Sequence, residues 1–249
     1  VAPGAAGAQP TTESVIKGGF SIPVSDAQGI KTLFSGKEMR PLGNGRVLVT
    51  QFRMTNREPA LIFEAPQCVL NPQTFEVSSA GPLKLFTTDR RFSLEGEGFE
   101  WLHTKSRLVV SNNVRTLISG DLRRRPLVST LSATATNRAT NVVHEIVSDQ
   151  FAYDAIAGEA RYSGNVRLVD PGWRLTCALL TGILQGGGGG LSNAVAETNV
   201  AIVLLDPRRE TRVTSAKAVY TSTSEGEQIA LSGSPVWESP PYRGNSDAM

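Results

Sequence analysis

The chain has 249 residues, of which 40% are hydrophobic and 19% are charged, and its formal net charge is +2. A chain of this length forms one or two domains, and all-β barrels and sandwiches of this size are often single domains. The small net charge and the lack of helix-turn-helix, RNP or zinc-finger spacing argue against nucleic acid as a partner.

The N-terminal stretch is rich in alanine, glycine and proline over residues 1–10. Within it, Ala6-Gly7-Ala8 before Gln9 resembles the small-residue end of a secretory signal whose apolar part is missing, which favours export. The alternative is a disordered tail with no targeting role. No later apolar run reaches about 18 residues, so no membrane-spanning helix is predicted. We expect residues 1–30 to form a flexible tail and a lead-in strand.

From residue 31 onward, apolar residues alternate with polar ones instead of recurring every three or four positions. This period of two is typical of half-buried strands, whose successive side chains point to opposite faces. Turn sequences such as Asp170-Pro171-Gly172 separate the runs and favour antiparallel neighbours. Residues 31–249 are therefore predicted to form an all-β fold, either whole or as two fused sub-units at about 31–120 and 140–249. The expected strands include residues 47–54, 60–64, 83–87, 106–111, 114–118, 142–147, 200–205 and 212–220.

A glycine-centred block recurs three times in this β pattern. Gly96, Gly164 and Gly233 mark the copies at intervals of 68 and 69 residues. The second and third copies also share an upstream serine, Ser148 or Ser215, that begins a run ending in tyrosine. Such repeats predict stacked β units, because one unit with a single apolar face cannot bury that face alone.

Alternation divides the side chains of each block between two faces. The charged and amide side chains of the second copy fall on one face, namely Arg161, Asn165 and Arg167. Its apolar face holds Ala160, Tyr162, Val166 and Leu168. The third copy repeats this apolar face with Ile229, Leu231, Pro235 and Trp237. Aromatic residues make up only 6% of the chain, so the interior is predicted to leave room for aliphatic chains.

Cysteine usage leaves the redox state open. Cys68 and Cys177 are the two cysteines of the chain, and both lie in strand-like runs. They could form a disulfide in an oxidising compartment or lie buried as two small apolar side chains. The glycine run at residues 186–190 is expected to be a hairpin tip, because no Gly-Lys-Ser/Thr sequence accompanies it.

Catalytic and metal-binding motifs are lacking. The two histidines, His103 and His144, stand outside any H-E-x-x-H, G-x-S-x-G or C-x-x-C context, and we expect both to be surface strand residues. Aspartates occupy turns and strand ends, where turn chemistry places them. The sequence therefore predicts a protein that is not an enzyme and that needs no cofactor or metal.

One dense charge run, Arg123-Arg124-Arg125, precedes Pro126. Arginine guanidinium groups match phosphate oxygens, so this run is a candidate contact for a phosphate or an anionic lipid. The alternative is a solvated loop.

Two blocks, residues 148–180 and 215–249, carry a family resemblance. Their S-x-x-x-x-Y opening, their centre Tyr162-Ser163-Gly164-Asn165-Val166 or Leu231-Ser232-Gly233-Ser234-Pro235, and their downstream turn resemble the OstA-like repeat of lipopolysaccharide transport proteins. Upstream, Ala65-Pro66-Gln67-Cys68 and Thr88-Asp89-Arg90-Arg91-Phe92 are similar to the LptC-type component of the same pathway. The resemblance covers residues 31–249 and includes the LptA type.

The resemblance implies an antiparallel, V-shaped β-jelly roll, a folded-over sheet whose open groove shields the acyl chains of lipopolysaccharide in the periplasm. It also implies stacking with other β-jelly-roll transport components through edge strands. Lipid would then bind the inner face of the sheet. The inner-face residues expected to bind it are Phe151, Tyr153, Ala160, Tyr162, Val166, Leu168, Leu175, Val200, Ile202, Ile229 and Leu231.

Two other functions remain open. A self-packed structural or adhesive β-repeat surface protein would have the same pattern with its interior filled by its own side chains. A carbohydrate-active jelly roll would need two carboxylates facing each other in a cleft, and the sequence offers no convincing pair.

Overall fold

The computed structural model describes residues 15–25, 31–56, 60–119, 143–184, 191–206, 209–223 and 226–245. Within these ranges, sixteen strands form one antiparallel sheet, and the one helix is the 3-10 turn η1 (His103–Lys105). The predicted all-β, antiparallel fold is therefore confirmed. None of the described helical residues forms a helix long and apolar enough to cross a membrane.

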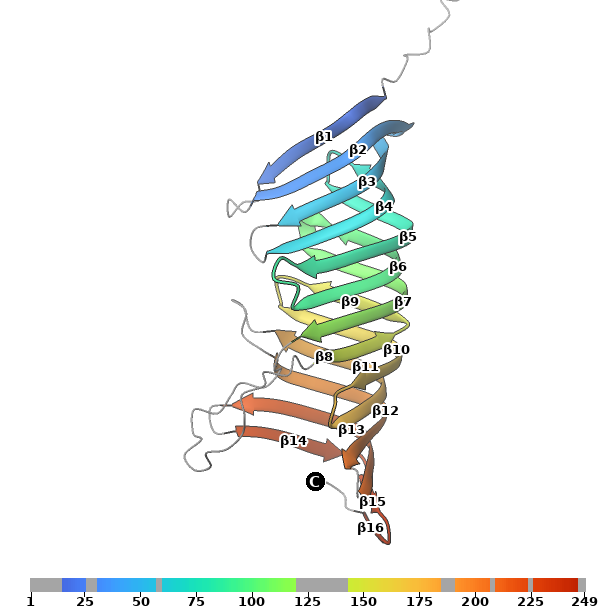
Figure 1. Ribbon diagram of the computed structural model, residues 1–249, viewed down its shortest axis with the longest axis vertical. Helices are drawn as coiled ribbons and strands as arrows, with labels where there is room; N and C mark the ends of the chain where they lie inside the picture. The colour runs from blue at the N-terminus through green and yellow to red at the C-terminus, as the bar shows by residue number, and fades with distance from the viewer. Residues whose placement is uncertain are drawn as a thin grey trace, which may run out of the picture.

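The strands follow one another along the long axis of the molecule (Figure 1). They are β1 (Ile16–Ser25), β2 (Lys31–Gly43), β3 (Arg46–Asn56), β4 (Leu61–Asn71), β5 (Glu76–Thr87), β6 (Phe92–Leu102), β7 (Arg107–Ser119), β8 (Val143–Ser148), β9 (Gln150–Asp154), β10 (Glu159–Val169), β11 (Trp173–Leu184), β12 (Leu191–Asp206), β13 (Arg209–Thr223), β14 (Gly226–Ser232), β15 (Val236–Ser239) and β16 (Tyr242–Asn245).

Neighbours in the sheet are neighbours in the chain, so the sheet is a meander. Two strands are split: β9 and β8 pair with successive halves of β10, and β14 and β15 pair with successive halves of β13. Among the described strands there is no Greek-key crossover, so the folded-over sheet of the prediction is present without jelly-roll strand order.

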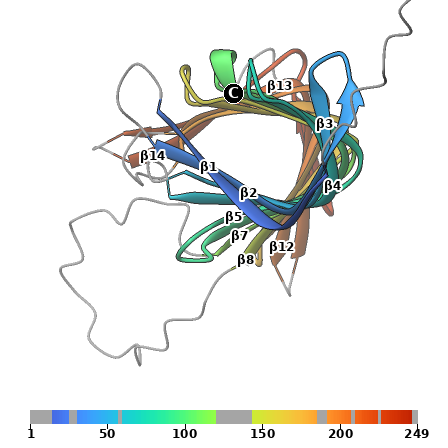
Figure 2. The same cartoon turned by 90° about the horizontal axis from the view of Figure 1, so that it is seen from above.

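Each split marks a corner at which the sheet folds over. We call the side that contains β8 and β15 arm 1 and the side that contains β9 and β14 arm 2. Seen along the long axis, the two arms lie on opposite sides of one interior (Figure 2). The unsplit strands cross the corner through register shifts, for example between Ser163 and Val166 of β10 and between Glu197 and Val200 of β12.

Backbone conformations with positive φ gather at this corner. In β10, Gly164 has φ of 74° and Asn165 has φ of 48°, and in β12 Thr198 and Asn199 have φ of 65° and 56°. Glycine adopts such angles readily, and asparagine tolerates them better than most residues. A short left-handed step inside a strand bends it, as in a β-bulge. The same local backbone chemistry recurs in β3, β6 and β7, so the corner follows in these strands from left-handed steps.

The repeats predicted from the sequence are real at the second and third copies. The N–H of Asp149 donates to the carbonyl of Gly164 at 2.9 Å, and the N–H of Ala216 donates to the carbonyl of Gly233 at 3.2 Å. The preceding serines make equivalent hydrogen bonds. The Ser148 hydroxyl donates to the Gln150 carbonyl at 2.8 Å, and the Ser215 hydroxyl donates to the Lys217 carbonyl at 3.1 Å.

The first copy was aligned on the wrong glycine. Gly98, with φ of 68°, carries the left-handed step in β6, whereas Gly96 lies on the inner face. A Cβ at Gly96 would approach Cγ1 of Val110 to 2.6 Å, so that glycine is required by close packing instead. In β6, Gly98 makes the left-handed step and Gly96 allows close packing, so the first copy aligns loosely with the other two.

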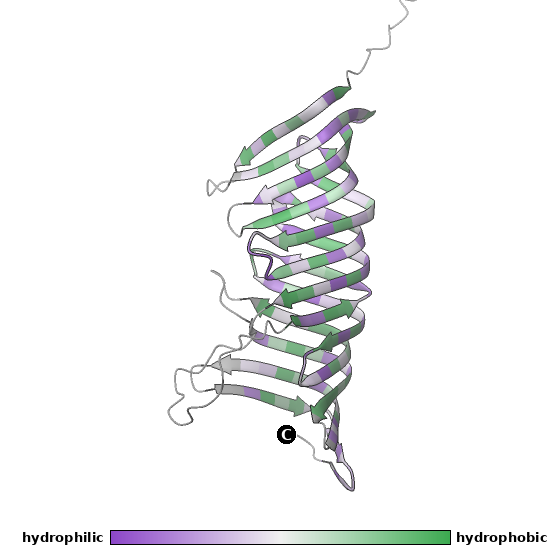
Figure 3. Ribbon diagram, in the orientation of Figure 1, coloured by the Kyte–Doolittle hydropathy of each residue, from purple (hydrophilic) through white to green (hydrophobic). Residues whose placement is uncertain are grey.

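The two predicted faces are confirmed in β10. Ala160, Tyr162, Val166 and Leu168 are between 1% and 7% exposed, and the intervening Arg161, Asn165 and Arg167 are exposed. The same alternation of apolar and polar residues runs along most strands (Figure 3). The inner positions of both arms form one hydrophobic core. The sheet is therefore amphipathic, with the apolar face inside the fold.

Cross-strand ion pairs line part of the outer face of arm 1. Arg53 pairs with Glu64 at 3.1 Å, Lys84 with Glu95 at 2.9 Å, and Arg115 with Glu145 at 2.6 Å. Exposed pairs contribute little stability each. Their alternating signs nevertheless favour one pairing register over a slipped one.

Both cysteines are free and buried. Burial raises the pKa of the Cys68 thiol to about 12 and that of the Cys177 thiol to about 11. A buried thiol that remains protonated is a poor nucleophile. The sequence left open a disulfide or two buried thiols, and the structure has two buried, free thiols.

We expect Gly164→Ala to lower the free energy of unfolding by roughly 2 kcal/mol or more, because alanine is strained at this φ and its Cβ would meet the Asp149 side chain. Urea unfolding measures the loss. Gly81→Ala in β5 is the matched control, since only Ser79 Oγ lies near its new Cβ, at 3.4 Å. Equal losses in both variants would contradict the role of the corner.

We expect neither thiol to react with a water-soluble disulfide reagent while the protein is folded, because the reactive thiolate is disfavoured at both sites. Mass spectrometry after brief labelling measures this, and labelling in denaturant is the control. A mass two units below the reduced value before treatment would reveal a disulfide and contradict the free state.

Candidate functional site

The candidate site is the inner face of the folded sheet, which differs between its two halves. From β2 to β10 the interior is filled by aromatic side chains. The Phe63 ring of arm 1 meets the Phe99 ring of arm 2 edge to face, with centroids 4.8 Å apart. Phe34 similarly approaches Phe75 and His103 at the rim of arm 2, with centroids 5.5 and 6.3 Å apart. We call this part the aromatic half.

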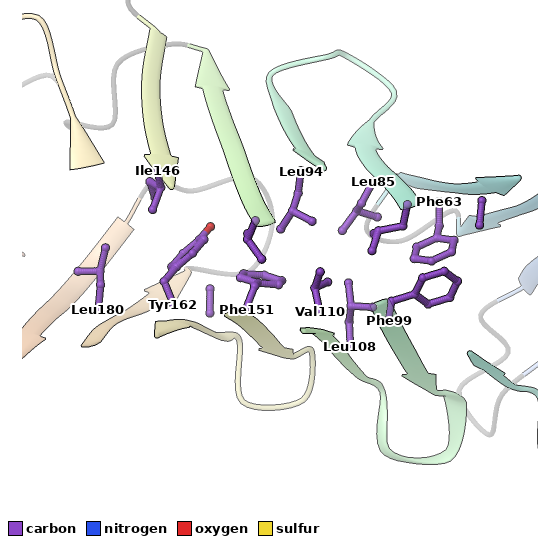
Figure 4. Close-up of a cluster of buried hydrophobic side chains, with 14 of the residues drawn as sticks. Phe63, Leu85, Leu94, Phe99, Leu108, Val110, Ile146, Phe151, Tyr162 and Leu180 are labelled. Atoms are coloured by element: carbon purple, nitrogen blue, oxygen red, sulfur yellow. The ribbon is translucent and has the colours of Figure 1, made fainter. Parts of the chain in front are cut away.

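The two arms face each other directly in the aromatic half (Figure 4). Leu85, Leu94 and Ile146 project from arm 1 toward Val110 and Phe151 of arm 2. These residues are between 0% and 7% exposed. Side chains of the protein itself therefore occupy the interior here.

A buried hydrogen bond joins the arms at the end of the aromatic half. The Tyr162 hydroxyl of arm 2 donates to Thr116 Oγ1 of arm 1 at 3.2 Å. Tyr162 also packs on Phe151, with ring centroids 4.9 Å apart. Burial raises the pKa of the Tyr162 hydroxyl to about 12, and the bond to Thr116 opposes this rise. The pair links β7 to β10 across the fold.

From β11 to β14 the inner face of arm 2 carries several small side chains. Gly182 lies opposite Ala194, and Leu180 lies opposite Ala196, which in turn lies opposite Ala218. Small side chains at these positions fill less of the interior than the phenylalanines of the other half. We call this part the small-residue half.

Two apolar side chains of the small-residue half are less covered than its other inner positions, most of which are buried. Leu204 of arm 1 is 46% exposed and Ile229 of arm 2 is 55% exposed, although their registers place both on the inner face. Ile202 and Leu231 are partly buried against the core. Exposed inner-face residues at one end of a core are surfaces that a lipid chain could cover.

The expected lipid-binding residues fall into three groups by environment. Buried in the aromatic half or at its edge are Phe151, Ala160, Tyr162, Val166 and Leu168. The second group lies in the small-residue half and consists of Leu175, Val200, Ile202 and Leu231. Tyr153 is partly buried beside the first group. Ile229 was expected to be buried and is exposed instead, because β14 is an edge strand with no further described strand beside it in arm 2.

The histidine prediction was wrong for His144. His144 of β8 is 5% exposed, and its Nδ1 lies 2.9 Å from Asp170 Oδ2. Asp170 itself is 8% exposed and accepts the N–H of Gly172 at 2.7 Å. The pair ties β8 to the β10–β11 turn. No sequence signal links the two residues, which are brought together by the pairing of β8 with β10.

The prediction of a strand position was wrong for His103, which begins η1 and packs on Phe34 and Phe75. Arg123, Arg124, Arg125 and the glycines at 186–190 lie outside the described residues. Among the residues that the structure describes, no three His, Cys, Asp or Glu side chains are grouped as metal ligands.

Comparison with models of known protein families gave no match, and comparison with curated proteins gave no match. The resemblance to lipopolysaccharide transport proteins therefore rests on the motifs of the sequence alone.

We expect Tyr162→Phe to lower the free energy of unfolding by about 1 kcal/mol near pH 7, because Thr116 loses its partner. Tyrosine in the unfolded chain ionises near pH 10 and Tyr162 in the fold near 12, so its contribution is complete below about pH 10 and is lost as the pH rises toward 12. Between pH 8 and 11 the free energy of unfolding, measured with urea, should therefore fall less steeply with pH in the variant than in the wild type. Tyr242→Phe at a 63% exposed position is the control, and identical pH profiles for wild type and Tyr162→Phe would refute the assignment.

Proposed function

We propose that the protein is a non-enzymatic, periplasmic lipid carrier or bridge segment that shields the acyl chains of lipopolysaccharide or a related lipid. The observation that carries this proposal is the incomplete burial of the apolar inner face in the small-residue half, where Leu204 and Ile229 remain about half exposed. The resemblance of the repeats supplies the lipid class and the compartment.

Acyl chains would lie between the arms of the small-residue half. Arm 2 contributes Ala194, Ala196 and Ala218, and arm 1 contributes the partly buried Ile202 and Val213. Covering a few hundred Å² of acyl surface is worth several kcal/mol at about 25 cal/mol per Å². This free energy suffices to hold a lipid without covalent chemistry.

The aromatic half would act as the rigid support of the carrier. Its interior already has occupants, so lipid contact there would require the arms to separate and break contacts such as Phe63–Phe99. Edge strands would dock neighbouring folded sheets by main-chain pairing. Within the described residues the edges are β1 at one end and β14 and β16 at the other.

A self-packed structural protein is the second candidate. The aromatic half favours it, because ring contacts and the Tyr162–Thr116 bond close that part of the interior. The two candidates differ in the small-residue half alone. There the carrier leaves space for a ligand, and the structural protein does not.

We expect Ala196→Phe to abolish or strongly weaken binding of fluorescently labelled lipopolysaccharide while leaving the folded state intact, because the ring would occupy the space of an acyl chain. Ala201→Phe is the matched control on the same strand, since Ala201 pairs with Thr176 and Thr214 on the outer face. Fluorescence anisotropy measures binding and urea unfolding measures stability.

In a self-packed interior, Ala196→Phe would instead cost about 1–3 kcal/mol from overpacking. That loss, together with wild-type protein that binds no lipopolysaccharide, would overturn the carrier proposal. Unchanged binding by Ala196→Phe would place the ligand elsewhere.

A further inference from the structure

The outer face of arm 1 changes its charge pattern between the two halves of the molecule. In the aromatic half, cross-strand register places one row of alternating charges across β3 to β7, namely Arg53, Glu64, Lys84, Glu95 and Arg115. Each cation of this row has an acid within ion-pair distance, and the last acid is Glu145 of β8 beside Arg115. The charges of this part of the face are therefore balanced.

The alternation of charge stops at β8. Val147 lies between Arg115 and Arg167 in the row, where another acid would continue the pattern. Arg167 is exposed and has no ion-pair partner in the part of the chain that the structure describes. Beyond it the row contains neutral residues, namely Thr176, Ala201, Thr214 and Val236. Arg167 is thus a cation that the row leaves uncompensated.

Two more exposed arginines lie in the neighbouring row of the same face. Arg174 of β11 lies opposite Val203 of β12, and Val203 lies opposite Arg212 of β13. Arg212 has Glu238 on its other side, but that carboxylate pairs with Arg243 at 3.2 Å. Among the described side chains, neither Arg174 nor Arg212 has an ion-pair partner.

Arg167, Arg174 and Arg212, which we call the arginine face, lie on strands that are close neighbours (Figure 1). Arg167 and Arg174 are diagonal neighbours about 7–8 Å apart, and Arg174 and Arg212 are two strand spacings or about 10 Å apart. Like charges at such distances repel each other. The exposed Glu210, two residues before Arg212, offsets a single charge. The arginine face therefore keeps a net positive charge that an anionic partner would neutralise.

Exposed aliphatic side chains border the arginine face. Val147, 40% exposed, lies opposite Arg167, and Leu205, 38% exposed, lies two residues beyond Val203 on β12. Arginines beside aliphatic side chains suit a layer of lipid headgroups, where phosphates lie next to apolar carbon atoms. A protein surface carries both signs of charge, so a face that docks it would also contain acids.

We propose that the arginine face docks the protein on a membrane whose surface contains anionic phospholipids. Guanidinium groups would pair with lipid phosphates of the membrane surface. The arginine face lies outside the interior of the folded sheet, so this docking would serve a lipid carrier and a structural protein alike.

The test is flotation of the whole protein with vesicles of phosphatidylcholine, either alone or mixed with an equal part of phosphatidylglycerol. Wild-type protein should float with the mixed vesicles and not with the neutral ones, and added salt should release it. Each arginine near an anionic surface contributes roughly a fivefold factor, so Arg167→Gln/Arg174→Gln/Arg212→Gln should lower the partition constant by roughly a hundredfold.

The matched control is Arg53→Gln/Lys84→Gln/Arg115→Gln, which changes the net charge by the same amount on the same arm but outside the arginine face. This control should retain most of the binding, and circular dichroism checks that both triple variants are folded. Val147→Glu should also weaken binding, because the new carboxylate would lie opposite Arg167 and continue the alternation.

Equal losses in the two triple variants would show that net charge acts without a defined face, and would overturn the proposal. Wild-type protein that does not float with the mixed vesicles overturns it as well. If that protein instead binds polyglutamate in a salt-sensitive way, the arginine face serves an acidic protein and not a membrane.

Discussion

A left-handed backbone step in mid-strand lets strands such as β6, β10 and β12 pass from one arm to the other, and the rest of the molecule depends on this step. The second and third repeats hold it with the same hydrogen bonds, at Asp149–Gly164 and Ala216–Gly233. Because each strand pairs with the next, one corner that failed to bend would displace its neighbours. The folding-over of the sheet, and with it the shared interior, is thus the sum of many local turns.

The interior shows how one sheet can combine a closely packed core with a less covered end. Aromatic rings that meet across the arms, such as Phe63 and Phe99, stabilise one half, since aromatic pairs contribute beyond their buried area. The other half has alanines at equivalent inner positions, for example Ala196 and Ala218. Small residues there forgo packing energy. A stable neighbouring half makes that loss tolerable, because both halves belong to one continuous sheet.

The sequence was sufficient to predict what depends on local pattern. Period-two alternation gave the all-β class and the two faces of β10, and the serine and glycine positions gave the second and third repeats. Contacts between distant strands were not accessible in this way. His144 and Asp170 lie 26 positions apart in the chain, and only the pairing of β8 with β10 brings them together. The exposure of Ile229 likewise follows from its place on an edge strand.

The division of the interior into two halves was also missed, although the sequence contains a signal for it. The phenylalanines precede the tryptophans and tyrosines almost completely along the chain. In a meander, position in the chain is position along the long axis, so a compositional gradient in sequence becomes a chemical gradient in space. Such a gradient has no meaning in a fold with crossovers, where early and late strands mix. Knowledge of the meander order is therefore what converts the aromatic distribution into a difference between the two ends of the interior.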